Sequence, residues 1–139
     1  MNKMYLFDTD FIISLVRGDK GAKSFAKKVD EEMAYRAISA ISVHEYLLGV
    51  YFSYWRKPQK LLEMLRKAES ELMRFEIIPY DYKIAKKSAE IEAQLTKSGQ
   101  IISLADIIIA ATAIIYNLQL VTRNTKHFSR IPDLKIKTY

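Results

Sequence analysis

The chain has 139 residues, no cysteine and a formal net charge of +6 at pH 7. This length suits one domain with a substantial core, and the lack of cysteine excludes disulfide frameworks, thiolate metal sites and redox motifs. Half of the residues are apolar and 12% are aromatic, which excludes a disordered chain. We expect a single folded domain, residues 1–139, in a reducing compartment such as the cytoplasm.

The basic charge balance, with a pI near 9.4, predicts an anionic partner, and nucleic acid first of all. The lysines and arginines are spread over several predicted helices, so most of them are expected to be solvated. Asp8 and Asp10 interrupt the only early apolar run, so we expect no signal peptide. The longest apolar stretch, residues 101–115, is too short and too polar to cross a bilayer.

Short apolar runs of strand length alternate with helical patterns along the chain. The predicted strands are residues 4–7, 37–41, 76–79, 119–122 and 134–137. The predicted helices include 10–17, 22–33, 61–72, 81–97 and 104–116, where the last is apolar on nearly every side and therefore buried. Asp81 can cap the start of its helix, and Ser98-Gly99 marks its end. This alternation predicts an α/β fold with a mostly parallel sheet of about five strands, covered on both faces.

Three isolated acids, Asp8, Glu45 and Asp106, stand where predicted strands give way to helices. In an open parallel sheet, the crevice beyond the carboxyl ends of the strands gathers such residues from distant parts of the chain. Three neighbouring carboxylates repel one another unless a cation neutralises them. Mg²⁺ or Mn²⁺ is the natural occupant, because these hard ions take oxygen ligands.

Each of these acids also has a structural interpretation. Ser42-x-x-Glu45 and Ser103-x-x-Asp106 both match the capping box, and Asp8 can cap the helix that follows it. We interpret Asp10 as a helix cap in the same way. The grouping of all three acids at expected strand ends favours the metal site, which would support hydrolysis of a phosphodiester by a water of lowered pKa. A basic surface would then hold the rest of the polymer.

Four motifs carry a resemblance to a known family. They are F-D-T-D-F-I, I-S-V-H-E-Y-L-L-G, I-S-L-A-D-I-I-I-A-A-T-A and L-V-T-R-N-T-K-H-F. In order and spacing they resemble the successive motifs of PIN-domain ribonucleases, and the T-R-N-x-x-x-F ending is similar to VapC-type toxins. The resemblance implies a three-layer α/β/α sandwich and a Mg²⁺- or Mn²⁺-dependent endoribonuclease.

The resemblance also implies roles for individual residues. Metal ligation falls to Asp8, Glu45 and Asp106, with Asn124 at the fourth position of the site. Thr9 and Thr122 would orient the acids. Many relatives have an aspartate within the stretch that here spans residues 124–128, whereas this chain has Asn124 and His127. The sequence therefore does not decide whether the site holds one metal ion or two.

The residues around Asn124 allow two interpretations. Arg123 and Lys126 can hold a phosphate or can belong to a solvated loop. His127 can contact water or RNA, although its spacing does not require this. Many aromatic residues crowd segment 46–55, which indicates either core or a partner surface. The resemblance implies a homodimer and a VapB-like antitoxin as partners.

Three alternatives remain. Phe7-Asp8-Thr9-Asp10 also resembles the start of haloacid-dehalogenase-type phosphatases, but the chain is short for that fold and lacks an Asp-Asp pair. A PIN-domain nuclease can act in RNA processing outside a toxin–antitoxin pair, which a small antitoxin gene upstream would argue against. A catalytically weakened PIN-like module that binds RNA or protein is the non-enzymatic alternative.

Overall fold

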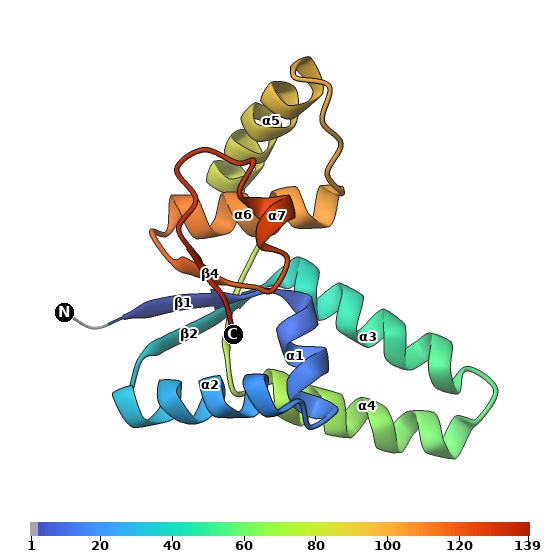
Figure 1. Ribbon diagram of the computed structural model, residues 1–139. Coiled ribbons are helices and arrows are strands. Elements are labelled where there is room, and N and C mark those ends of the chain that lie inside the picture. Colours follow the sequence, from blue (N-terminus) through green and yellow to red (C-terminus); the bar gives the residue numbers. More distant parts are fainter. Residues whose placement is uncertain (1–2) are drawn as a thin grey trace.

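The computed structural model describes residues 3–139 and shows one parallel sheet between two layers of helices (Figure 1). The strands are β1 (Met4–Phe7), β2 (Tyr35–Ser39), β3 (Glu76–Ile78), β4 (Gln119–Val121) and β5 (Ile136–Lys137). They lie in the order β3-β2-β1-β4-β5, and every neighbouring pair is parallel. The predicted α/β class with about five parallel strands is confirmed.

Seven helices occupy the segments between the strands within the described residues. They are α1 (Thr9–Val16), α2 (Lys20–Glu32), α3 (Ala40–Tyr54), α4 (Pro58–Leu72), α5 (Tyr82–Lys97), α6 (Leu104–Ile115) and α7 (Thr125–Phe128). The predicted boundaries of α5 are confirmed, since the Asp81 carboxylate accepts a hydrogen bond from the Ile84 N–H and Gly99 has a φ of +72°. No helix within residues 3–139 has the length and apolar character needed to span a bilayer.

The central strand shows how the sheet fills two cores. Successive side chains of a strand point to opposite faces, so Tyr5 and Phe7 face one layer while Leu6 faces the other. Tyr5 and Phe7 pack with residues of α1 and α2, and Leu6 packs with residues of α5 and α6. Both groups of helices are visible on opposite sides of the sheet in Figure 1. The predicted burial of α6 is confirmed, because seven of its residues are buried.

The boundary between β2 and α3 differs from the prediction. The sequence predicts a strand over residues 37–41, but β2 ends at Ser39. The Ser39 hydroxyl caps α3 by accepting a hydrogen bond from the Ile41 N–H at 3.1 Å. Ser39 and Ile78 form the last residue pair between the parallel strands β2 and β3. The observed cap therefore lies three residues before the predicted cap Ser42, and the capping-box interpretation of Ser42-x-x-Glu45 is wrong.

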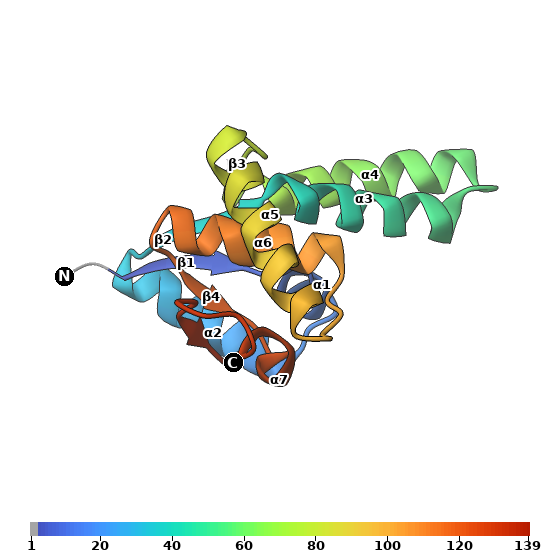
Figure 2. The ribbon, with the colours of Figure 1, turned by 90° about the horizontal axis from the view of Figure 1, so that it is seen from above.

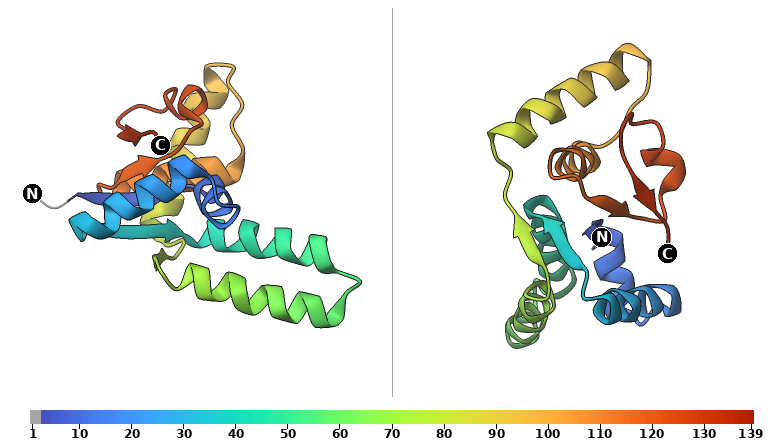
Figure 3. Two further views of the ribbon diagram at one scale, coloured as in Figure 1. Left: turned by 60° about the horizontal axis from the view of Figure 1, so that its bottom comes forward. Right: turned by 90° about the vertical axis from the view of Figure 1, so that its left-hand side faces the viewer.

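The α3 and α4 helices pack against each other as an antiparallel hairpin that projects beyond the sheet (Figures 2 and 3). Ser42 is the one fully buried residue of α3, and Tyr46 and Leu47 are partly buried against the core. Phe52 and Trp55, near the tip, are 75% and 68% exposed. The aromatic segment that sequence analysis singled out therefore contributes to the core at its start and is surface toward the tip of the hairpin.

Phe7 is the residue on which we expect the core below the sheet to depend most. It is 1% exposed, and its ring lies 4.4 Å from that of Phe11 and 5.5 Å from that of Phe75. Phe7→Ala should lower the free energy of unfolding by about 3–5 kcal/mol, because it removes a large buried side chain and leaves a cavity. Urea denaturation measures this, with Ile101→Ala, at a position 90% exposed, as a control that should change little. Similar midpoints for the two variants would contradict the packing described.

Candidate active site

An acidic pocket of about 260 Å³ opens at the carboxyl edge of the sheet. The strand order reverses direction between β1 and β4, which is where open α/β sheets bind their ligands. Four carboxylates line this pocket, contributed by Asp8, Asp10, Glu45 and Asp106. None of the described residues that line it is basic. The structure thus brings the three predicted acids together and adds a fourth.

Asp8 connects the pocket to the fold. Its carboxylate caps α1 by accepting from the Phe11 N–H at 2.9 Å, and it accepts from the Thr122 hydroxyl at 2.6 Å. Thr122 follows β4, so this second bond joins the ends of the two strands at the switch point. Burial raises the pKa of Asp8 to about 6, and repulsion from Asp10 and Asp106 adds to the rise, while the Thr122 and Phe11 hydrogen bonds oppose it.

Glu45 reaches the pocket from the second turn of α3. Thr9 lies 2.7 Å from the Glu45 carboxylate and 2.9 Å from the Ser42 hydroxyl. A carboxylate only accepts, so the Thr9 hydroxyl donates to Glu45 and accepts from Ser42. Because Ser42 and Glu45 lie on the same side of α3, the helix presents both to Thr9 at the start of α1.

Asp106 stands in the first turn of α6. Ser103 caps this helix by accepting from the Asp106 N–H at 3.2 Å, so the predicted cap is confirmed. Burial raises the pKa of the Asp106 carboxyl, and His127 and Ser103 partly offset the rise. The His127 Nε2 atom lies 3.5 Å from Asp106 Oδ2. This Nε2 atom is buried and takes part in no hydrogen bond with residues 3–139.

The remaining predicted residues lie outside the acidic pocket. Asn124 is exposed, and its backbone N–H donates to the Thr122 hydroxyl at 3.0 Å. Arg123 forms an ion pair with Asp19 at 2.5 Å, and its Nε donates to the Tyr139 carbonyl oxygen at 3.0 Å. Lys126 is exposed on α7. The structure therefore places Arg123 in a contact between the β4 end and α2, and not at the acids.

Asp10 is the pocket residue that sequence analysis missed. The sequence predicts that Asp10 is a helix cap, but Asp8 holds that position, and Asp10 lies in the first turn of α1. An acid in the first turn is favoured by the helix dipole, so a structural reason alone can explain its presence. The Asp8-Thr9-Asp10 sequence directly after a strand could have indicated this role. Asp10 follows the cap residue Asp8 so closely that both reach the pocket at the same edge of the sheet.

The carboxylate oxygens that line the pocket are the type of ligand that a hard divalent cation prefers. All four acidic groups offer oxygen ligands, and such ions commonly keep several waters while binding one or two carboxylates directly. As the side chains stand, no three acidic or histidine groups within residues 3–139 converge closely enough to hold one ion. Hydrogen bonds from Thr122, Thr9 and Ser103 hold the three predicted acids individually.

Fold and pocket together define a class of protein, the three-layer α/β/α domain with a carboxylate-lined site at the carboxyl edge of a parallel sheet. A family model described as PIN domain matches residues 5–134. Ribonuclease VapC1 from Methanocaldococcus jannaschii is 36% identical over 115 residues, which cover 83% of this chain and 78% of the relative. Ribonuclease VapC from Rickettsia bellii is 34% identical over 96% of this chain and 94% of its own length.

The solved structures agree with these sequence matches. VapBC2 from Rickettsia felis, bound to a promoter DNA fragment, superposes with a TM-score of 0.82 at 28% identity and 98% coverage of both chains. The chain belongs to the PIN-domain family, in its VapC-type group, and the resemblance drawn from the four motifs is confirmed.

The raised pKa of Asp8 predicts a dependence of stability on pH. A group with a folded-state pKa of about 6, above its ordinary 3.8, stabilises the fold fully below 3.8 and loses that contribution as pH rises through 6. Asp8→Asn keeps an acceptor for the Phe11 N–H and removes the buried charge. At pH 7 in EDTA the variant should be more stable than wild type, by at most about 3 kcal/mol.

Urea denaturation of both proteins between pH 4 and pH 7 measures this difference. The advantage of Asp8→Asn should shrink as pH falls. A difference in unfolding free energy that stays constant over this range would show that the Asp8 carboxylate is not destabilised by burial.

Proposed function

We propose that this protein is a Mg²⁺- or Mn²⁺-dependent endoribonuclease and a VapC-type toxin. The observation that carries the proposal is that Asp8, Asp10, Glu45 and Asp106 line one pocket at the switch point of the sheet. Relatives named Ribonuclease VapC, matched over most of both chains, support RNA as the substrate. The net charge of +6 suits a polyanion.

Asp8, Glu45 and Asp106 would hold the metal, and Asp10 would add negative charge beside them. When bound, a divalent cation supplies a water of lowered pKa and offsets charge on the phosphate. Thr122 and Thr9 aim the Asp8 and Glu45 carboxylates, since each donates a short hydrogen bond to its acid.

The loop after β4 would contribute the remaining polar groups. We place Asn124 and Lys126 at the rim, toward the RNA strand. Arg123 can contact a phosphate only if it leaves Asp19, so in the present geometry it holds the loop that carries Asn124.

A protein antitoxin is the partner that we propose for this toxin. Structures matched over nearly the whole chain are VapBC complexes, some of them bound to DNA. The exposed aromatic residues at the C-terminal end of α3, which include Phe52 and the C-cap residue Trp55, suit a protein interface, either with an antitoxin or with a second copy in a homodimer. We place this system in the cytoplasm, where its RNA substrate would be.

Asp106→Asn should abolish RNA cleavage, lowering the rate by about 100-fold or more, because it removes a carboxylate from the pocket without changing its volume. Purified wild type and variant, both free of antitoxin, are incubated with a mixed structured RNA in Mg²⁺, in Mn²⁺ and in EDTA. Wild type should cleave only with metal.

Asp133→Asn is the matched control. It makes the same chemical change on the exposed surface, at a residue with φ of +68° that asparagine tolerates. The control should cleave like wild type. Equal cleavage by wild type and Asp106→Asn would locate the activity elsewhere, and inactive, well-folded wild type across many RNAs would favour the binding module.

His127→Ala tests whether the imidazole positions Asp106. Loss of a partner that holds a ligand carboxylate typically weakens metal affinity by about 10- to 100-fold, so the Mg²⁺ concentration for half-maximal cleavage should rise by about 10-fold. The maximal rate at saturating Mg²⁺ should fall less. His44→Ala, at an exposed position of α3, serves as the control. An unchanged Mg²⁺ requirement in His127→Ala would show that the imidazole does not position Asp106.

A further inference from the structure

A second, basic cleft of about 370 Å³ lies between α2 and α4, beside the C-terminal end of α1. It belongs to the layer of helices on the lower side of the sheet in Figure 1, whereas α5 and α6 lie on the upper side. Its charged lining residues are Lys23, Lys27, Asp30, Lys67, Glu71 and Arg74. Cations therefore outnumber acids here, the reverse of the acidic pocket.

The acids of the cleft are already neutralised by arginines. Glu71 pairs with Arg74 at 3.3 Å, and Asp30 pairs with Arg36 at the inner end of the cleft. The three lysines form no ion pair with any residue in the range 3–139. They come from two helices that are far apart in sequence, since Lys23 and Lys27 lie one turn apart on α2 and Lys67 lies on α4. Their charge is thus free to attract an anion.

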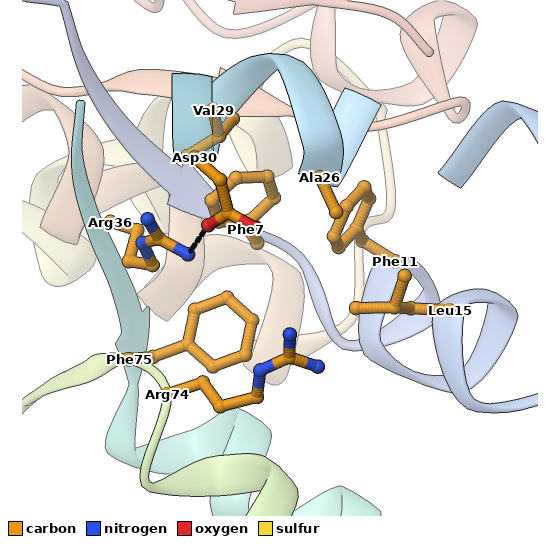
Figure 4. Close-up of a pocket in the computed structure, with 9 residues that line it drawn as sticks. All are labelled: Phe7, Phe11, Leu15, Ala26, Val29, Asp30, Arg36, Arg74 and Phe75. Atoms are coloured by element: carbon orange, nitrogen blue, oxygen red, sulfur yellow. Dashed lines mark hydrogen bonds and ion pairs between the residues drawn. The ribbon is translucent and has the colours of Figure 1, made fainter. Parts of the chain in front are cut away.

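A small cavity, lined by apolar side chains and by Asp30, Arg36 and Arg74, adjoins the cleft. In Figure 4 the rings of Phe7, Phe11 and Phe75 lie around this cavity, with Arg74 and the Arg36–Asp30 pair beside them. Its volume of about 20 Å³ admits little more than a water molecule. The cleft itself is open and has an excess of cations, which suits a strand of phosphates.

The cleft is continuous with the acidic pocket. Val16 lines both the cleft and a neighbouring groove of about 210 Å³, and that groove shares Ile13 and Glu45 with the acidic pocket. Arg17 also lines this connecting groove. The path follows the eight residues of α1, which span about 12 Å. This length corresponds to roughly three or four stacked nucleotides.

We propose that the α2–α4 cleft is an RNA exosite, in which Lys23, Lys27 and Lys67 hold phosphates a few nucleotides away from the bond that is cleaved. The proposal rests on RNA being the substrate, as set out under the proposed function. It follows from the charge distribution, because four carboxylates at the acidic pocket repel an RNA strand and the lysines can offset this repulsion.

Binding of a fluorescein-labelled 20-nucleotide single-stranded RNA, measured by anisotropy in EDTA, tests the exosite without metal or cleavage. The test variant is Lys23→Gln/Lys27→Gln/Lys67→Gln in the full chain. The control is Lys83→Gln/Lys86→Gln/Lys97→Gln, which removes the same charge from exposed positions of α5 on the other side of the sheet. Thermal denaturation verifies that both variants fold.

The cleft variant should bind about 10- to 100-fold more weakly at 0.1 M KCl. Its plot of log K against log salt should also be shallower by about 2, as expected for three lost phosphate contacts. The control should change by less than about 3-fold. Equal weakening of both variants, or of neither, would overturn the proposal. Unchanged RNA affinity combined with weaker binding of a labelled deca-glutamate peptide would assign the cleft to an acidic protein instead.

The exosite and the proposed nuclease can fail separately. If wild type binds RNA through the lysines but cleaves no RNA in Mg²⁺, the exosite stands and the nuclease does not. If wild type cleaves RNA and the cleft variant binds it normally, the nuclease stands and the exosite does not.

Discussion

The buried side chain of Asp8, through the hydrogen bonds that it accepts, is the group on which both the fold and the site depend. It begins α1 by accepting from the Phe11 N–H, and through Thr122 it ties the end of β1 to the end of β4. Without these bonds, a carboxylate that is 5% exposed would have no compensation for its lost hydration. Even with them, burial and the neighbouring acids keep its pKa near 6. The protein therefore maintains an electrostatically unfavourable group at the place where its chemistry is expected, a conflict typical of functional sites.

Charge is segregated over the surface, and this segregation explains how a basic protein can have an acidic centre. The chain carries +6 overall, yet the described lining of the central pocket is acidic and has no cation. Excess positive charge lies instead on helices around it, with a concentration between α2 and α4. The two regions would act on a polyanionic substrate in opposite ways. The basic helices would attract the nucleic-acid strand, and the acidic pocket would repel the reacting phosphate. A cation bound among the acids would remove the repulsion locally while leaving the acids free to orient it.

Much of the fold could be predicted because local signals were strong. The apolar run of β1, the cap and glycine at the two ends of α5, and the uniformly apolar α6 all formed as expected. The error at β2 arose because residues 40 and 41 continue an apolar run, while the hydroxyl of Ser39 begins a helix within it. The gathering of Asp8, Glu45 and Asp106 was also predicted, although the reason given was incomplete. Glu45 and Asp106 lie on early turns of helices and not at strand ends, and α6 follows another helix and no strand.

By itself, the sequence determined the alternation of helices and strands, the parallel sheet, the family and the identity of the three predicted site acids. All of these can be recognised from local periodicity and from motifs of a few residues. Tertiary structure alone decided which neighbours these residues meet. It joined Thr9 to Glu45 and His127 to Asp106, turned Arg123 toward Asp19, and brought lysines of α2 and α4 to one cleft. Contacts between residues so far apart in the chain depend on how the helices pack across the sheet. That packing is set by the summed burial of the two cores, which no local pattern records.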